Sequence, residues 1–331
     1  MKISVALCSF NGASYLRKQL VSILNQTLKV DEIVISDDAS TDDTMEIIRS
    51  VERQCEGVAF RVFSNETNVG FRHNFLKALG LCQGKLVFLA DQDDIWHENK
   101  VETIVKWFTA HPEKQVVFTD ADLIDSDGVP IGGSLWQRFG FDKKKQRYFD
   151  HDHALDIWGW SNRATGATMA VKKAFIDKIK WEQYENAFHD SIISWQGVVH
   201  HTIGYLDEKL IDYRLHSSQV CGADNMPREF QYSPLKPVFS DFLYPGFLEN
   251  DIQFIPELEQ KKIRFILQRS TFKYTWFGWG PVSHFWKYLS YYHSWSYRFF
   301  FYDLFVSVKH SIRRLTRLMM LFLLSLPQIP I

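Results

Sequence analysis

The sequence predicts an α/β protein whose mostly parallel sheet is flanked by helices. Over residues 3–119, short runs of β-branched and apolar residues alternate with longer segments in which apolar residues recur every three or four positions. This alternation is typical of strand–helix–strand units on a parallel sheet. The chain has 331 residues, of which 46% are hydrophobic, so it is long enough to bury a large core.

Five strands and four helices are expected in this part of the chain. The strands are Ile3–Leu7, Glu32–Ser36, Ala59–Ser64, Leu86–Ala90 and Gln115–Thr119. The helices are Tyr15–Asn25, Thr41–Gln54, Phe71–Leu81 and Lys100–His111. Ser40 is the expected N-cap of the second helix, and Asp43 supports its first turn.

Polar side chains follow each of the first four predicted strands. They are Ser9 and Asn11 with Phe10 between them, then Asp38, then Asn68, and finally Asp91, Gln92, Asp93 and Asp94. Ligands bind outside the carboxyl ends of the strands in an open α/β sheet, so these residues are candidates for a binding site. The sequence contains neither GxGxxG after the first strand nor GxxxxGK[ST] anywhere, which argues against a dinucleotide site or a P-loop.

The three aspartates after the fourth strand raise a physical problem. Asp91, Asp93 and Asp94 lie within four positions, and like charges so close together repel one another and resist burial. Mg²⁺ or Mn²⁺ is typically held by one or two carboxylates, with substrate phosphates completing its shell. The pattern therefore favours a metal and nucleotide site; the alternative is a solvent-exposed turn.

Six sequence segments occur in a characteristic order, namely VALCSFNGASYLRKQLVSILNQT, VISDDASTDDT, NVGFRHNFLKAL, VFLADQDDIW, FHDSIISW and DYRLHSSQVCG. In this order they resemble the GT-A glycosyltransferases of family 2, and most closely their bacterial rhamnosyltransferase-type members. The resemblance spans residues 2–222. It implies a Rossmann-like GT-A catalytic domain over residues 1–225, an inverting hexosyltransferase.

The resemblance implies nucleotide binding by the residues at the strand ends. Asp38 matches an aspartate that accepts a hydrogen bond from the imide N–H of uracil or thymine, and Phe10 matches an aromatic residue that flanks the base. Ser9, Asn11, Asn68, Arg72, Asn74, Asp91 and Gln92 match the remaining polar positions near the nucleotide. By composition alone, Asp38 would equally suit a cap of the helix after it.

The resemblance also implies the metal ligands and the general base. Asp93 and His216 match positions near Mn²⁺ or Mg²⁺, and Asp190, in FHDSII, matches the acid of an HD motif that takes the acceptor's proton. Arg214, Gly166 and Thr168 match positions on the diphosphate and acceptor side. Without the resemblance, Asp190 would be interpreted as a helix N-cap and His216 as a structural histidine.

One acid of the cluster is expected to have a structural role. Asp94 is expected to cap a helix that begins near His97.

The implied reaction moves a sugar from a nucleoside diphosphate to a lipid-linked polysaccharide. The first expected donor is dTDP-rhamnose, and the alternative is UDP-galactose, UDP-glucose or UDP-N-acetylglucosamine. FHDSIISWQG departs from the bulkier HDWW of similar sequences, which leaves the acceptor open. A non-catalytic sugar- or membrane-binding module is the alternative from another class. A nucleotidyltransferase is a further one, against which the missing glycine-rich phosphate loop argues.

The C-terminal part of the chain differs in charge from the rest. Residues 260–331 hold eleven Lys and Arg and one acidic residue, a net charge of +10. Because the whole chain has a net charge of −1, residues 1–259 have a net charge of −11. Aromatic and basic residues suit the headgroups of an anionic membrane, and no uncharged apolar run reaches the ~20 residues of a spanning helix. We expect residues 226–331 to form amphipathic helices on the inner face of the cell membrane.

Other interpretations of this region remain. It could pack on the catalytic domain or form a homodimer interface; nucleic-acid binding is not expected, because the rest of the chain is acidic. The four cysteines contain no CxxC pair, and MKISVALCSFNG is typical of a first strand and not of a secretory signal. A cytoplasmic protein, peripheral on the membrane, is therefore expected.

Overall fold

The computed structural model describes residues 1–150, 154–158, 162–184, 187–217, 219, 251–255, 257 and 260. All of these except Gln260 belong to one compact unit. Almost all of the expected membrane-associating region, 226–331, lies outside the described residues, so that region and its boundary at 225 stay predictions. Within the described ranges, no helix combines the length and apolar character that crossing a membrane requires.

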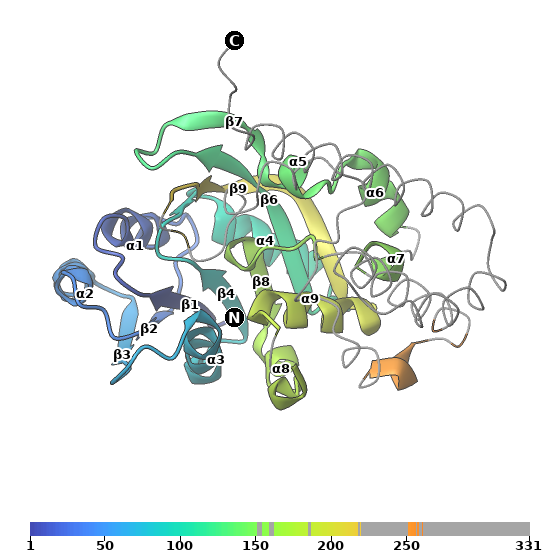
Figure 1. The fold of residues 1–331 in the computed structure, drawn as a ribbon, viewed down its shortest axis with the longest axis horizontal. Coiled ribbons are helices and arrows are strands. Elements are labelled where there is room, and N and C mark those ends of the chain that lie inside the picture. The colour runs from blue at the N-terminus through green and yellow to red at the C-terminus, as the bar shows by residue number, and fades with distance from the viewer. Residues whose placement is uncertain are drawn as a thin grey trace, which may run out of the picture. The chain divides into compact units, whose positions relative to one another are not determined.

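The first half of the sheet is parallel. Its strands are β1 (Ile3–Ser9), β2 (Glu32–Asp37), β3 (Ala59–Ser64) and β4 (Leu86–Ala90), in the order β3-β2-β1-β4. The connecting helices are α1 (Leu16–Leu24), α2 (Thr44–Gln54) and α3 (Phe71–Leu81). Helices α1 and α2 pack together on one side of these strands, and α3 covers the other (Figure 1). The predicted strand–helix alternation is confirmed here, with the bounds of β3, β4 and α3 as predicted.

The second half of the sheet is mixed. Strand β8 (Met169–Lys172) lies antiparallel between β4 and β6 (Val116–Ile124), and β9 (Ile203–Arg214) runs parallel to β6. The short β5 (Ile95–Trp96) pairs with β9, and β7 (Pro130–Ser134) pairs with β6, both antiparallel. Of these strands only the start of β6 was predicted. The structure therefore keeps the α/β class but has a parallel half joined to a mixed half.

The remaining helices of the described residues connect and cover the mixed half. They are α4 (Lys100–Ala110), α5 (Leu135–Phe139), α6 (Lys143–Tyr148), α7 (Ala154–Trp158), α8 (Lys173–Ile176) and α9 (His189–Val199), with the 3₁₀ turns η2 (Gly166–Thr168), η3 (Trp181–Tyr184) and η4 (Ile252–Phe254). Every residue of β1, β2 and β4 is buried, as expected for central strands covered on both faces.

The start of α2 differs from the prediction. The N-cap is Asp43 and not Ser40. The Ser40 hydroxyl donates to Asp37 Oδ1 at 2.6 Å, and the Ser40 amide donates to Asp37 Oδ2 at 2.9 Å. Asp37 at the end of β2 therefore organises a turn that delays the helix by three residues.

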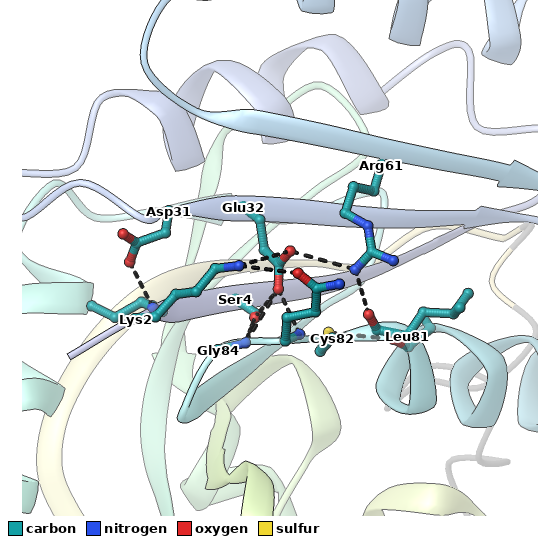
Figure 2. A network of polar contacts seen from close by, with 11 residues as sticks. Lys2, Ser4, Asp31, Glu32, Arg61, Leu81, Cys82 and Gly84 are labelled. Carbon is teal, nitrogen blue, oxygen red and sulfur yellow. Dashed lines mark hydrogen bonds and ion pairs between the residues drawn. The ribbon is translucent and has the colours of Figure 1, made fainter.

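A buried carboxylate joins the amino-terminal ends of the strands (Figure 2). Glu32 accepts hydrogen bonds from Ser4 Oγ at 2.6 Å, from the Gln83 amide at 2.6 Å and from the Gly84 amide at 3.2 Å. Arg61 Nη1 lies 3.5 Å from the same carboxylate and also donates to the Leu81 carbonyl. One side chain thus ties β1, β2, β3 and the turn before β4.

A segment from far along the chain packs on α9. The Asp251 carboxylate is buried and accepts hydrogen bonds from Tyr184 Oη at 2.8 Å and from Trp195 Nε1 at 2.8 Å. Gln196 Nε2 donates to Tyr184 Oη at 2.8 Å. Burial and the neighbouring Asp251 charge raise the pKa of Tyr184, so its hydroxyl stays a donor. Asp251 therefore fixes α9 to the turn that precedes it.

Replacing Glu32 by glutamine tests the role of this carboxylate in stability. Burial alone would raise the pKa of Glu32, but hydrogen bonds from Ser4 and Gln83 and nearby positive charge more than offset it, so the pKa lies below its usual value. All three donors point to Oε1, whose place a glutamine oxygen can take, but the Glu32→Gln variant loses the negative charge that Lys2 and Arg61 face at Oε2. We expect the free energy of unfolding at neutral pH, measured by urea denaturation, to fall by about 1–3 kcal/mol.

The pH dependence of this loss has a defined sign. Because the folded-state pKa is lowered, the contribution of the ionised Glu32 is complete at neutral pH and is lost as the pH falls through that pKa. The difference between wild type and variant should therefore shrink in acid. Glu52→Gln, at an exposed position of α2, is the control and should leave stability unchanged. Equal stability of wild type and Glu32→Gln at neutral pH would contradict this account.

Candidate functional site

The ends of β1 and β2 lie side by side at the carboxyl edge of the sheet. Ser9 pairs in register with Asp37, and Ser9 Oγ donates to Asp37 Oδ1 at 2.8 Å. Both residues are buried. Ser9, a predicted nucleotide-binding residue, is thus held inside the edge, where it fixes the turn after β2.

Asp38 organises the loop that leads into α3. Its Oδ1 accepts from Asn65 Nδ2 and from the Val69 amide, both at 2.8 Å, and its Oδ2 accepts from the Gly70 amide at 2.9 Å. The alternative that Asp38 caps the helix following it is wrong, because α2 has Asp43 as its N-cap and Asp38 faces α3 instead.

The predicted amides of this region lie in the same network. Asn74 is buried; its Nδ2 donates to the Ser36 carbonyl at 2.7 Å and its Oδ1 accepts from Asn65 Nδ2 at 3.1 Å. Asn68 Oδ1 accepts from the Gly70 amide at 3.0 Å. The structure therefore brings Asp38, Asn68 and Asn74 together, while their contact with a nucleotide stays a prediction.

Gln92 holds the loop after β1. Its Oε1 accepts from the Phe10 amide at 2.9 Å, and its Nε2 donates to the Phe10 carbonyl at 3.1 Å. A Cβ at Gly12 would lie 2.2 Å from Gln92 Oε1, so only glycine leaves room for this amide. The Phe10 side chain is left 39% exposed at the rim, where an aromatic ring is available for stacking.

Asn11 completes this loop with a left-handed backbone. Its φ is 46°, a conformation that asparagine tolerates better than most residues. The Asn11 amide donates to Ser40 Oγ at 2.9 Å, and Asn11 Oδ1 accepts from the Thr41 amide at 2.9 Å. The loops after β1 and β2 are thus joined.

Asp93 and His216 meet across the site. Asp93 Oδ2 lies 2.9 Å from His216 Nε2, although 123 positions separate them. Their side chains are 13% and 8% exposed, and the His216 ring lies 4.8 Å from the ring of Tyr15. The two residues predicted as metal ligands are therefore adjacent, one after β4 and one after β9.

Asp91 and Asp190 carry further negative charge nearby. Burial first, and then the charges of Asp93 and Asp190, raise the pKa of Asp91 to about 7. Within the described part of the chain, no hydrogen-bond donor reaches the Asp91 carboxylate. Burial raises the pKa of Asp190 to about 6, and hydrogen bonds from Gly166 and Ser191 limit the rise. The site is short of positive charge.

Asp190 lies in the first turn of α9 and points towards η2. Its Oδ2 accepts from the Gly166 amide at 3.2 Å and its Oδ1 from the Ser191 amide at 2.7 Å. The N-cap of α9 is Phe188, so Asp190 is not the cap. A Cβ at Gly166 would lie 3.0 Å from His189 Nε2, which explains the glycine. Thr168, also predicted here, is buried and donates to the Thr165 carbonyl at 2.8 Å.

The prediction that Asp94 caps a helix is wrong. Asp94 is buried, and its Oδ1 accepts from the Arg214 amide at 3.0 Å. The chain forms β5 directly after Asp94, and α4 begins only at Lys100 with Asn99 as its N-cap. Burial, together with the charges of Asp93 and Asp91, raises the pKa of Asp94.

Arg214 lies beneath the acidic loop. Its Nε donates to the Asp93 carbonyl at 2.6 Å, and its Nη1 donates to the carbonyls of Asp125 and Ser126 at 3.0 and 3.1 Å. Its guanidinium carbon lies 4.7 Å from the Tyr15 ring centroid, and the residue is 1% exposed. Arg214 therefore supports the loop that presents Asp93, while its predicted contact with a diphosphate stays a prediction.

Lys100 is a functional candidate that sequence reasoning missed. It is fully buried, and its Nζ donates to the Ala167 carbonyl at 2.8 Å. Burial lowers the pKa of Lys100 to about 7, although the charges of Asp94 and Asp91 oppose this shift. The lysine thus joins the start of α4 to η2, and its lowered pKa makes it a group that can gain or lose a proton near neutral pH. No sequence signal marks it, because a lysine in the first turn of a helix is normally solvent-exposed.

The residues present fit a divalent cation. Asp93 and His216 offer a carboxylate and an imidazole as adjacent ligands. Burial and then the charges of Asp93 and Asp190 raise the pKa of Asp91, so a cation here would offset negative charge that is costly to bury. A second group, His97, Asp122 and Asp212, has ligand atoms within 4.8 Å of one another. There, however, His97 pairs with Asp212 and Lys209 pairs with Asp122, so protein groups already balance the charge.

Known proteins match this chain in sequence and in fold. The family model for glycosyl transferase family 2 matches residues 4–164. An uncharacterized glycosyltransferase of Haemophilus influenzae is 31% identical over 226 residues, which cover 67% of this chain and 68% of that protein. Chondroitin synthase of Escherichia coli is 26% identical over 183 residues, covering 55% of this chain and 26% of the synthase.

The structural comparison supports the fold. The crystal structure of TarS residues 1–349 from S. aureus, in complex with UDP-GlcNAc, has a TM-score of 0.54 at 16% identity. The match covers 89% of this chain and 74% of that chain.

Several other curated relatives are matched over only 37% to 40% of their own length. The family match, the extended similarity to the Haemophilus protein and the shared fold agree. The chain therefore belongs to glycosyl transferase family 2, and its folded unit is a glycosyltransferase domain.

Proposed function

We propose that this protein transfers a sugar from a nucleoside diphosphate donor to a polysaccharide acceptor. The observation that carries the proposal is the meeting of Asp93 and His216 at 2.9 Å beside Asp91. Asp190 is close enough to this cluster for its charge to raise the pKa of Asp91. The proposed metal and diphosphate site therefore lies close to the proposed base, at the carboxyl ends of the strands.

The proposed chemistry is a single displacement at the anomeric carbon. A divalent cation held by Asp93 and His216 would offset the negative charge of the departing diphosphate. Asp190 takes the proton of the acceptor hydroxyl as its oxygen bonds to the anomeric carbon and the bond to the nucleoside diphosphate breaks. The amides of Gly166 and Ser191 hold the Asp190 carboxylate in place. This route inverts the anomeric configuration and needs no covalent intermediate on the protein.

The donor base is proposed to lie between Phe10 and Asp38. The Phe10 ring is exposed at the rim, and Gln92 fixes its backbone through two hydrogen bonds. Asp38 already accepts three hydrogen bonds, which leaves its two oxygens room for one more donor, such as the imide N–H of uracil or thymine. We propose dTDP-rhamnose as the first donor to test and a UDP-hexose as the alternative. TarS, which shares the fold, was crystallised with UDP-GlcNAc.

The acceptor is proposed to be a growing polysaccharide carried on a lipid. Chondroitin synthase, one of the matched relatives, is named for a polysaccharide product. The net charge of +10 over residues 260–331 suits the surface of an anionic membrane, where a lipid-linked acceptor would lie.

Removing Asp93 should abolish metal-dependent donor binding. Without this carboxylate, His216 is the one proposed ligand left. Titration calorimetry measures the factor by which Mn²⁺ increases the affinity for UDP or dTDP, and we expect this factor to be at least about tenfold smaller in Asp93→Ala than in wild type. Asp177→Ala, at an exposed position directly after α8, is the control and should bind as wild type does. Unchanged affinity of Asp93→Ala in Mn²⁺ would remove Asp93 as a ligand.

Replacing Asp190 by asparagine should stop transfer and leave donor binding intact. Because the base acts in its ionised form and burial raises its pKa to about 6, the wild-type kcat should fall as the pH drops below about 6. The Asp190→Asn variant should lose about 10²- to 10⁴-fold in kcat, as removal of a general base usually does. The donor used in this assay is identified by screening nucleotide sugars, first for thermal stabilisation of the protein and then for product formation. Full transfer activity in the variant would refute the role of Asp190.

Adding a methyl group at Gly12 should weaken nucleotide binding without unfolding the protein. The new Cβ displaces the Gln92 amide, which is the end of a flexible side chain, and removes its two hydrogen bonds to Phe10. At roughly 1 kcal/mol for each of the two bonds, we expect up to about a 30-fold loss in UDP or dTDP affinity. Gly80→Ala, in α3 with nothing within 4 Å of the added Cβ, is the matched control. Wild-type affinity in Gly12→Ala would show that this contact does not position the loop.

A further inference from the structure

Helix α3 holds the three residues that directly precede Asp190. The Phe71 ring lies 5.0 Å from the ring of Phe188, and the Phe75 ring stacks on His189 at 3.9 Å with 17° between the planes. Between these two contacts, Arg72 Nε donates to the Ala187 carbonyl at 2.9 Å.

Arg72 also holds the turn further upstream. Its Nη2 donates to the carbonyls of Trp181 and Tyr184 at 3.2 and 3.1 Å, so one guanidinium joins both ends of η3 to the start of α9. A planar guanidinium has several donors in a fixed arrangement and can bind three carbonyls at once, here those at the two ends of η3 and that of Ala187, two residues before α9. These bonds connect residues 109 to 115 positions apart.

The same helix is anchored to the proposed donor side. The amides of Val69 and Gly70, at the start of α3, donate to Asp38, and Asn74 within the helix donates to the Ser36 carbonyl at the end of β2. The first turn of α3 therefore lies between the carboxylate proposed to read the base and the segment that carries the proposed general base. A shift of this turn would move Asp190 relative to the donor.

We propose that Arg72 is a positioning residue of the transfer reaction, which fixes the start of α9 and so sets where the Asp190 carboxylate stands relative to the bound donor. This inference rests on the proposed function, because it takes Asp190 as the base. It gives Arg72 a role other than the nucleotide contact that its sequence position suggested. Arg72 acts on the base through the Ala187 carbonyl and does not itself touch the reacting atoms.

The test replaces Arg72 by methionine in the full chain, which keeps much of the side-chain volume and removes every hydrogen-bond donor. We expect kcat for transfer to fall by about 10- to 100-fold, the usual effect of misplacing a catalytic group by about 1 Å. The dissociation constant for UDP or dTDP in Mn²⁺ should not change, because Asp38, Phe10 and Asp93 keep their places. Arg72→Lys should recover part of the kcat, since an ammonium group can still bond one carbonyl. This partial recovery tests the inference even if Arg72→Met folds poorly.

Two comparisons separate this inference from the proposed function. Arg17→Met removes an exposed arginine of α1 and should leave both kcat and donor affinity unchanged. A loss of kcat in Asp190→Asn together with wild-type kcat in a folded Arg72→Met would overturn the positioning role and leave the proposed function standing. Loss of donor affinity with unchanged kcat in Arg72→Met would assign Arg72 to the nucleotide instead. Full activity in Asp190→Asn would overturn both.

Discussion

Negative charge gathered at the carboxyl edge of the sheet is the constraint on which the rest of this site depends. Asp91, Asp93 and Asp94 follow β4, and Asp190 approaches them from α9. Burying carboxylates so close together costs free energy unless positive charge or donors offset it. The fold provides a buried arginine behind the loop and a histidine against Asp93, whereas the buried Lys100 has a pKa lowered to about 7. What remains uncompensated suits a cation and a donor diphosphate.

The opposite edge of the sheet is built for rigidity. There the buried Glu32 has its partners supplied by the protein itself, from β1, from β3 and from the turn before β4. The contrast is physical: a carboxylate with all its partners inside the fold stabilises it, whereas carboxylates left short of partners remain available for ligands. Because β1, β2 and β4 are parallel, their amino-terminal ends lie together near Glu32 and their carboxyl ends lie together near the aspartates.

The sequence could predict the parts of the fold in which local pattern and tertiary environment agree. Strands β1 to β4 are short segments rich in β-branched and apolar residues and α3 has a clear helical period, so their bounds were found closely. Strand β9 has the exposed residues Asp207, Glu208 and Lys209 in its middle, β8 has four residues, and β5 has two; none shows a strand pattern of its own. Their pairing partners decide their conformation. The cap expected at Asp94 failed for this reason, since pairing of Ile95 with Asp212 draws the chain into the sheet.

In the candidate site, too, residues in recognisable sequence segments could be predicted and residues defined by distant contacts could not. Asp38, Asp93, Asp190 and His216 could be named because they stand in recognisable sequence segments, and the structure places Asp93 against His216. Lys100 and the contacts of Arg72 could not be found in this way, because their partners are distant in sequence and are backbone carbonyls, which leave no trace in residue identity.

The Asp251 contact bears on how this protein can be shortened. The family resemblance ends at residue 222 and implies a domain boundary at 225, yet Asp251 lies beyond it and accepts hydrogen bonds from Tyr184 and Trp195. A chain ended at 225 would leave the tyrosine hydroxyl and the indole N–H without their buried acceptor, next to the helix that carries Asp190. Any minimal catalytic fragment should therefore retain the sequence through Ile255, which is itself buried.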